Sequence, residues 1–69
     1  MAQVKNFKGE AVTVKIGDVV GFKSDHEQYG KITAIKGDCL TLENPSGFGG
    51  DYLRYATVTE EYASDCWID

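Results

Sequence analysis

The chain has 69 residues and a formal net charge of −4. This length predicts one domain with one small core, and no apolar run is long enough to span a membrane. The start of the sequence lacks the apolar stretch of a signal peptide, so we expect a cytoplasmic protein in which Cys39 and Cys66 are reduced thiols.

The charge is divided unevenly along the chain. Up to Gly37 there are six lysines and four acidic residues, and beyond it Arg54 is the only basic residue among seven acidic ones. The first part therefore carries +2 and the second −6. An acidic surface attracts basic partners and repels a phosphate backbone, which argues against nucleic acid as the partner.

The first half of the chain predicts strands in place of helices. Residues 1–15 are expected to form an N-terminal arm or an edge strand, because they are lysine-rich and only weakly apolar. A strand is predicted at residues 19–23, with Val20 and Phe22 on one face. A polar loop at 24–28 and a second strand at 29–36 follow.

The second half continues the pattern with stronger turn signals. Gly37-Asp38 predicts a tight hairpin, followed by a strand in which Leu40 and Leu42 point inward. Residues 44–50 form the strongest break, after which a strand is expected at 51–59. One helical turn at Ser64-Asp65 and a short closing strand at 66–68 complete the prediction.

Five short strands in so few residues favour an all-β domain closed into a small barrel, since an open sheet would leave long unpaired edges. The segments Ile16–Lys23, Tyr29–Ile35 and Leu40-Thr41-Leu42, with Gly37-Asp38 between the last two, resemble the opening hairpins of SH3-like barrels of the KOW and Tudor-like groups. The resemblance covers residues 16–69 and implies a five-stranded SH3-like barrel there.

A second resemblance rests on two short segments. Glu27–Gly30 and Gly47–Tyr55 together resemble small uncharacterised proteins of tailed bacteriophages. This resemblance implies expression in a bacterial host and carries no activity that transfers to the chain.

Catalytic signals are weak, and we expect neither an enzyme nor a cofactor or metal site. His26, the only histidine in the sequence, lies between Asp25 and Glu27. The side chains of consecutive residues on an extended loop point in different directions, so these three are poorly placed to bind one metal ion. Type II dihydrofolate reductase is also a short SH3-like barrel, but residues 51–55 lack the Gln-Ile pair that holds its ligands. The glycine-rich stretch at 47–51 lacks the lysine and helix of a phosphate loop.

Aromatic residues are too numerous for so small a core. Phe22, Tyr55 and Trp67 are assigned to packing, which leaves Tyr29, Phe48, Tyr52 and Tyr62 near the surface. Exposed rings beside acidic groups form grooves for proline-rich or basic peptides, and the alternative is that the rings merely cover the outer face of the barrel. The predicted partner-binding residues are Asp25, Glu27, Tyr29, Phe48, Asp51, Tyr52 and Arg54.

The sequence therefore favours a non-catalytic protein-interaction module, which we interpret as a phage-encoded accessory protein with a basic or proline-rich partner. Two alternatives stay open. A KOW-like nucleic-acid-associated module would use the lysine-rich first segment, and a structural virion component would hide its aromatic residues in subunit contacts. The oligomeric state is left open as well.

Overall fold

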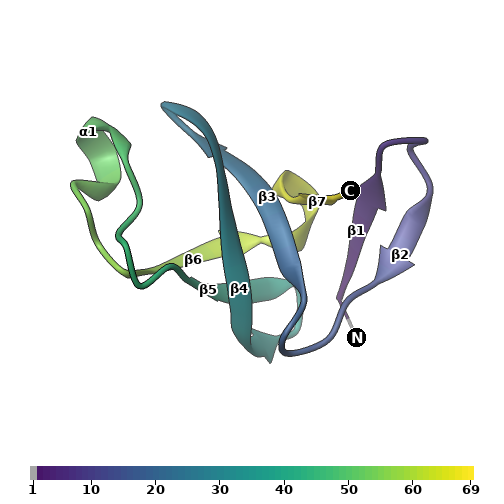
Figure 1. Cartoon of the computed structure of the whole chain (residues 1–69). Coiled ribbons are helices and arrows are strands. Elements are labelled where there is room, and N and C mark those ends of the chain that lie inside the picture. The colour runs from purple at the N-terminus through teal and green to yellow at the C-terminus, as the bar shows by residue number, and fades with distance from the viewer. Residues whose placement is uncertain (1) are drawn as a thin grey trace.

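Seven strands form one mixed sheet in the computed structural model, which describes residues 2–69 (Figure 1). A short helix and a 3₁₀ turn complete the domain, which is mostly β. The elements in chain order are β1 (Gln3–Asn6), β2 (Ala11–Thr13), β3 (Val19–Ser24), β4 (His26–Lys36), β5 (Cys39–Glu43), α1 (Gly50–Leu53), β6 (Val58–Tyr62), η1 (Ala63–Asp65) and β7 (Trp67–Ile68).

The strands follow the spatial order β2-β1-β7-β3-β4-β5-β6. The β1–β7 pair is parallel and the other pairs are antiparallel. Within residues 2–69, β2 and β6 are the two edges and do not pair with each other, so the sheet is not closed. The prediction of a mainly β domain is confirmed, whereas the prediction of five strands is wrong.

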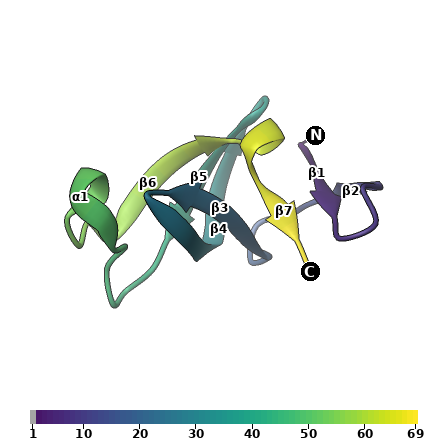
Figure 2. The ribbon, with the colours of Figure 1, turned by 90° about the horizontal axis from the view of Figure 1, so that it is seen from above.

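The strand count differs because the first fifteen residues pair more fully than their weak apolar pattern suggests. β1 and β2 form a hairpin in which Val4 faces Val12. Ala2, Val4 and Val14 are buried, so this hairpin contributes to the core. β2 is the edge strand, and β1 joins the rest of the sheet through β7, which lies between β1 and β3 (Figure 2).

Alternation along the central strands builds the core. Val20 and Phe22 of β3 face inward as predicted, and so do Leu40 and Leu42 of β5. Ile32 belongs to β4, the strand between β3 and β5; it pairs with Leu42 and is buried as well. The fully buried large side chains are Phe22, Phe48, Ile32, Leu40, Leu42, Val4 and Val20.

Two turns show how local chemistry decides strand ends. Gly37-Asp38 makes the predicted hairpin, since Lys36 pairs with Cys39 and Gly37 has φ 59°. The prediction of a polar loop at 24–28 is wrong, because β3 extends to Ser24 and β4 begins at His26, with Asp25 as the single residue between them. Asp25 has φ 65°, a left-handed conformation that aspartate tolerates better than most residues.

The strand predicted at 51–59 is also wrong. The chain makes a helical turn at Gly50–Leu53, and β6 begins only at Val58. The helical turn predicted near Ser64-Asp65 is confirmed as η1, and the short closing strand is β7. Trp67 of β7 lies over Gly21 of β3, where any Cβ atom would collide with the indole ring.

Candidate functional site

The segment at residues 47–56, which we call the α1 loop, extends from one end of the sheet (Figure 1). Backbone hydrogen bonds close its base. The Phe48 N–H donates to the Ala56 carbonyl at 2.8 Å, and the Tyr55 N–H donates to the Phe48 carbonyl at 2.7 Å. Inside the loop, the Arg54 N–H donates to the Gly50 carbonyl at 3.1 Å. The loop is therefore a folded unit.

Gln28 of β4 attaches this loop to the sheet. The side chain is buried, and its Nε2 donates to the carbonyls of Ser24 at 2.9 Å and Gly49 at 3.0 Å. Its Oε1 accepts from the Gly49 N–H at 2.7 Å. One side-chain amide thus satisfies both backbone groups of Gly49, which would otherwise lose hydrogen bonds next to the core.

Asp25 provides a second attachment at the start of α1. Its Oδ2 accepts from the backbone N–H groups of Asp51 at 2.7 Å and Tyr52 at 3.2 Å. These donors belong to the first turn of α1 and have no partner within the helix. Gly50, at φ 92°, leaves room for the carboxylate, since a Cβ there would lie 2.7 Å from Oδ2.

Phe48 is the anchor of the loop in the core. We expected it at the surface, and that expectation is wrong because the side chain is fully buried. Its ring meets Phe22 edge-to-face, with 5.2 Å between centroids and 74° between planes. Gly30 of β4 makes the space, since a Cβ there would lie 3.0 Å from the Phe48 ring. The flanking glycines let the chain turn inward so that the ring reaches the core.

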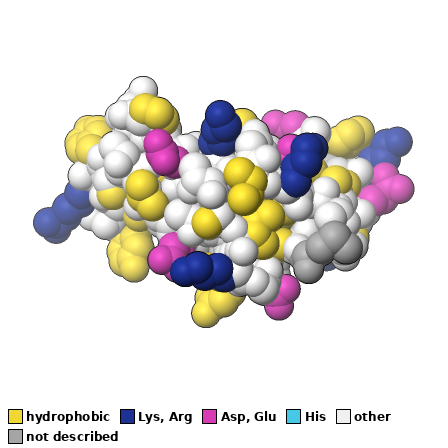
Figure 3. Space-filling model, turned by 90° about the horizontal axis from the view of Figure 1, so that it is seen from below, with side chains coloured by type: hydrophobic (Ala, Val, Ile, Leu, Met, Phe, Trp, Pro, Cys, Tyr) yellow, Lys and Arg dark blue, Asp and Glu magenta, His cyan; other side chains and the backbone are white. Residues whose placement is uncertain are grey.

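Tyr52 and Tyr55 are the rings that the loop leaves in solvent. Their side chains are 82% and 78% exposed, whereas Tyr55 was assigned to packing by its place in the predicted strand. That assignment is wrong because the chain turns at Leu53 in place of running straight. Figure 3 shows hydrophobic side chains at the end of the molecule that carries α1 and also across the middle of this face, with charged side chains between them.

The backbone under these rings is strained. Arg54 and Tyr55 have φ values of 49° and 67°, and Asp25 has 65°. In residues 2–69 these three are the only residues other than glycine with positive φ, and all three lie in the α1 loop or contact it. Each such conformation costs of order 1 kcal/mol, and such residues cluster at functional sites.

The predicted partner-binding residues fall into three places. Four of them are brought together at the α1 loop, namely Asp25, Asp51, Tyr52 and Arg54. The Nε of Arg54 donates to the Asp51 carbonyl at 3.1 Å. Glu27 and Tyr29 instead lie on the outer face of β4, where Tyr29 meets Trp67 edge-on at a centroid distance of 6.4 Å. Phe48 is in the core.

Two residues of the site escaped the sequence analysis. Tyr55 was missed because a strand was predicted through it. Gln28 was missed because a glutamine in a polar run carries no sign that it will be buried. The one available signal was the glycine cluster at 47–50, which is denser than a simple hairpin needs.

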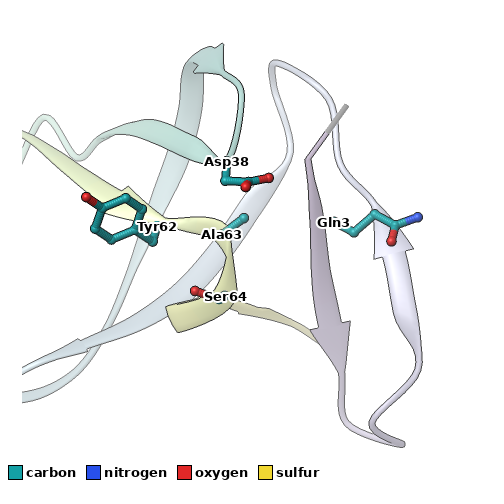
Figure 4. A pocket seen from close by; sticks show the side chains of 5 residues that line it. All are labelled: Gln3, Asp38, Tyr62, Ala63 and Ser64. Atoms are coloured by element: carbon teal, nitrogen blue, oxygen red, sulfur yellow. The ribbon is translucent and has the colours of Figure 1, made fainter.

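A second surface feature lies at the other end of β6. A cavity of about 430 Å³ is lined by Gln3, Asp38, Tyr62, Ala63 and Ser64. Figure 4 shows Asp38 just above Ala63 and Tyr62 to its left, while the side chain of Gln3 points away from the other four. Among residues 2–69, no hydrogen bond or ion pair joins the side chains of Asp38 and Tyr62, so we assign no chemistry to this cavity.

The two thiols are free and both are poor nucleophiles at neutral pH. Cys66 is buried, and this burial, followed by the charges of Glu61 and Asp65, raises the pKa of its thiol to about 12. Burial, followed by a hydrogen bond to Glu60, raises the pKa of Cys39. Across residues 2–69, no three His, Cys, Asp or Glu side chains are grouped to hold a metal ion.

Comparisons with known proteins give no relative from which function could be transferred. No helix among residues 2–69 is long and apolar enough to cross a membrane. No protein-family model, curated protein or solved structure matches the chain significantly. What the structure defines is a small, mostly-β domain with a pinned aromatic loop at one end.

Proposed function

We propose that the chain is a non-catalytic protein-interaction module whose contact surface is the α1 loop. The observation that carries this proposal is the contrast between the two ends of the loop. Its base is held by Phe48 in the core and by Gln28, while Tyr52 and Tyr55 are 82% and 78% exposed. A loop pinned this firmly that buries neither ring is suited to display them.

The energetics of association support such a role. Tyrosine offers a large contact area with few rotatable bonds, and it is enriched among residues that dominate binding energy. A loop already ordered before binding loses little conformational entropy when a partner docks. The strain at Arg54 and Tyr55 fits a segment shaped for contact, since the fold does not need these rings for its core.

The partner we propose is a basic or proline-rich protein segment. Flat tyrosine rings pack well against proline, and Asp51 adds a negative charge beside Tyr52. The Asp25 carboxylate lies next to these groups but is occupied with backbone N–H groups, so Asp51 is the acid more open to a partner.

The finer fold and setting belong to the same proposal. A 3₁₀ turn before a last short strand, as in η1 and β7, is compatible with an SH3-like barrel that has stayed open at β2 and β6. The resemblance to tailed-phage proteins supports an accessory role in the cytoplasm of a bacterial host.

The proposal is tested by capture of partners from bacterial lysate on the immobilised chain, quantified by mass spectrometry. We expect the double variant Tyr52→Ala/Tyr55→Ala to bind the captured protein about thirtyfold more weakly, since each ring is expected to contribute about 1 kcal/mol. Phe7→Ala is the matched control, because Phe7 is also an exposed aromatic residue, at 80%, but lies between β1 and β2 and outside the loop.

A second variant separates binding from folding. Tyr55→Gly removes the ring and relieves the left-handed backbone, so it should raise the free energy of unfolding by about 1 kcal/mol while lowering capture. Undiminished capture by both loop variants would end the proposal.

Nucleic-acid association is the second candidate, favoured by one row of side chains. Lys5 pairs with Trp67, Trp67 with Gly21, and Gly21 with Tyr29, which places two rings and a lysine side by side on the outer face. Lys31 is two residues beyond Tyr29 on the same face. Binding of a single-stranded oligonucleotide that weakens steeply with salt and with Tyr29→Ala would favour this candidate.

A further inference from the structure

We infer that the free edge of β6 binds an extended, basic peptide segment by adding it as an eighth strand of the sheet. This surface is separate from the α1 loop, and the inference does not rest on the proposed function. β6 lies along the outer border of the sheet (Figure 2), and within the described residues 2–69 it pairs with β5 alone.

Two hydrogen bonds at the ends of β6 fix which backbone groups face outward. The Asn44 N–H donates to the Thr57 carbonyl at 2.9 Å, and the Ala63 N–H donates to the Asp38 carbonyl at 2.7 Å. The register between these bonds is unbroken, from Glu43 opposite Val58 to Cys39 opposite Tyr62. Since antiparallel pairs alternate, residues 59 and 61 bond to β5, and Val58, Glu60 and Tyr62 direct their N–H and C=O groups away from it.

These outward groups are free to bind. Among residues 2–69, no hydrogen bond outside the ladder involves the backbone of Val58, Glu60 or Tyr62. Val58 and Tyr62 are 50% and 65% exposed, and Glu60 between them is exposed too. The edge therefore presents unpaired donors and acceptors together with an apolar–acidic–apolar row of side chains, which is a template for another strand.

Charge selects the occupant. β6 carries Glu60 and Glu61, and the chain has no lysine or arginine after Arg54. The only ion pair among residues 2–69 joins Lys15 to Asp18, so neither glutamate has a cation within 4 Å. Glu60 also acts on Cys39 of the neighbouring strand β5. Burial contributes most to raising the pKa of the Cys39 thiol, and the hydrogen bond to Glu60 and the charge of Glu60 raise it further. A basic strand would neutralise this edge.

Two other occupants fit this edge less well, one because of charge and the other because of hydrogen bonding. A second copy paired antiparallel along the full length of β6 would set Glu60 opposite Glu60, and like charges directly opposite each other destabilise a sheet. A proline-rich segment lacks the N–H groups that an added strand must donate. The occupant is therefore extended and basic, with a lysine or arginine opposite Glu60 and apolar residues beside Val58 and Tyr62.

The probe is the peptide Thr-Val-Thr-Lys-Thr-Val-Thr, titrated into the full chain and followed by NMR. We expect amide hydrogen exchange to slow about fivefold at Val58, Glu60 and Tyr62, with little change at residues 59 and 61, which already bond to β5. Binding that leaves the exchange at those three amides unchanged overturns the inference.

Two altered peptides separate hydrogen bonding from charge. Methylating the amide nitrogens of Val and Lys removes the donors that face β6 in the antiparallel arrangement but keeps the charge, and it should abolish binding. Replacing Lys by Glu should weaken binding at low salt. Equal affinity for the methylated peptide would show attraction by charge alone and would refute strand addition.

Variants of the chain supply the matched test. Val58→Pro removes one outward N–H without breaking a bond to β5, and it should weaken peptide binding about fivefold relative to Val58→Ala. Glu60→Gln should weaken binding about threefold at low salt, while Glu10→Gln, in the β1–β2 turn, should not. Equal binding by Val58→Pro and Val58→Ala contradicts the inference, and so does a chain that dimerises through β6 and takes no peptide.

Discussion

Gln28 is the residue on which the candidate site depends most. Its buried amide makes three hydrogen bonds, two of them to Gly49, and so joins β4 to a segment about twenty residues further along the chain. Phe48, next to Gly49, is fully buried against Phe22. The position of the exposed tyrosines is therefore set by two buried side chains, Gln28 and Phe48.

Replacing Gln28 by leucine tests this role. The variant leaves the N–H and C=O of Gly49 without partners beside the core, so we expect the free energy of unfolding to fall by about 3 kcal/mol. Urea denaturation measures the change. Gln3→Leu is the control, since Gln3 is exposed and makes one long hydrogen bond of 3.4 Å to Thr13; a loss for Gln28→Leu no larger than for the control would contradict the role.

Sequence patterns predicted residues well where alternation decided their environment. Leu40 and Leu42 lie in a clean β pattern and are buried as expected. Phe48 and Tyr55 exchanged environments relative to the prediction, because their exposure is set by the path of the α1 loop. That path depends on contacts with Gln28 and Asp25, which are distant in sequence and leave no periodic signal.

At the scale of elements, the edge strands explain how an open sheet avoids the problem that led us to expect a closed barrel. β2 has only three residues, so it offers little edge. β6 places Glu61 and Thr59 on the same face as Leu40 and Leu42, and the Thr59 hydroxyl donates to Glu61 at 3.0 Å. A charge of this kind on an edge strand discourages pairing with strands that carry no basic residue. The sequence analysis could not predict this, because it expected a strand at 51–59, whereas β6 spans Val58–Tyr62.

Proline substitutions in β6 test its register by stability alone. Glu61→Pro removes an N–H that bonds to β5, and we expect it to lower the free energy of unfolding by about 3 kcal/mol. Val58→Pro removes an outward N–H and should cost less than about 1 kcal/mol. Thermal and urea denaturation compare the two variants, and an equal loss for both would show that the assigned alternation is wrong.

For the whole molecule, negative charge is concentrated late in the chain and influences the buried thiol. Cys66 is held protonated by burial and by the charges of Glu61 and Asp65, which together raise its pKa to about 12. The thiol of a cysteine in the unfolded chain has its ordinary pKa of about 9. The folded state thus keeps a proton that the unfolded state releases between these two values, and the stabilisation is complete only below the lower one.

Stability should therefore fall as the pH rises from about 9 towards 12. Urea midpoints measured across this range for the native chain and for Cys66→Ala isolate the thiol, because the two chains differ only at that residue. We expect a shallower decline for Cys66→Ala. Parallel declines would show that the thiol does not contribute.

The whole account depends on the α1 loop being rigid while its tyrosines are exposed. Backbone ¹⁵N relaxation of Tyr52, Arg54 and Tyr55 measures this directly in the free protein. We predict order parameters of about 0.85, equal to those of β4, because Gln28, Asp25 and Phe48 hold the loop in place. Order parameters below about 0.6 at these residues would contradict a preformed binding surface.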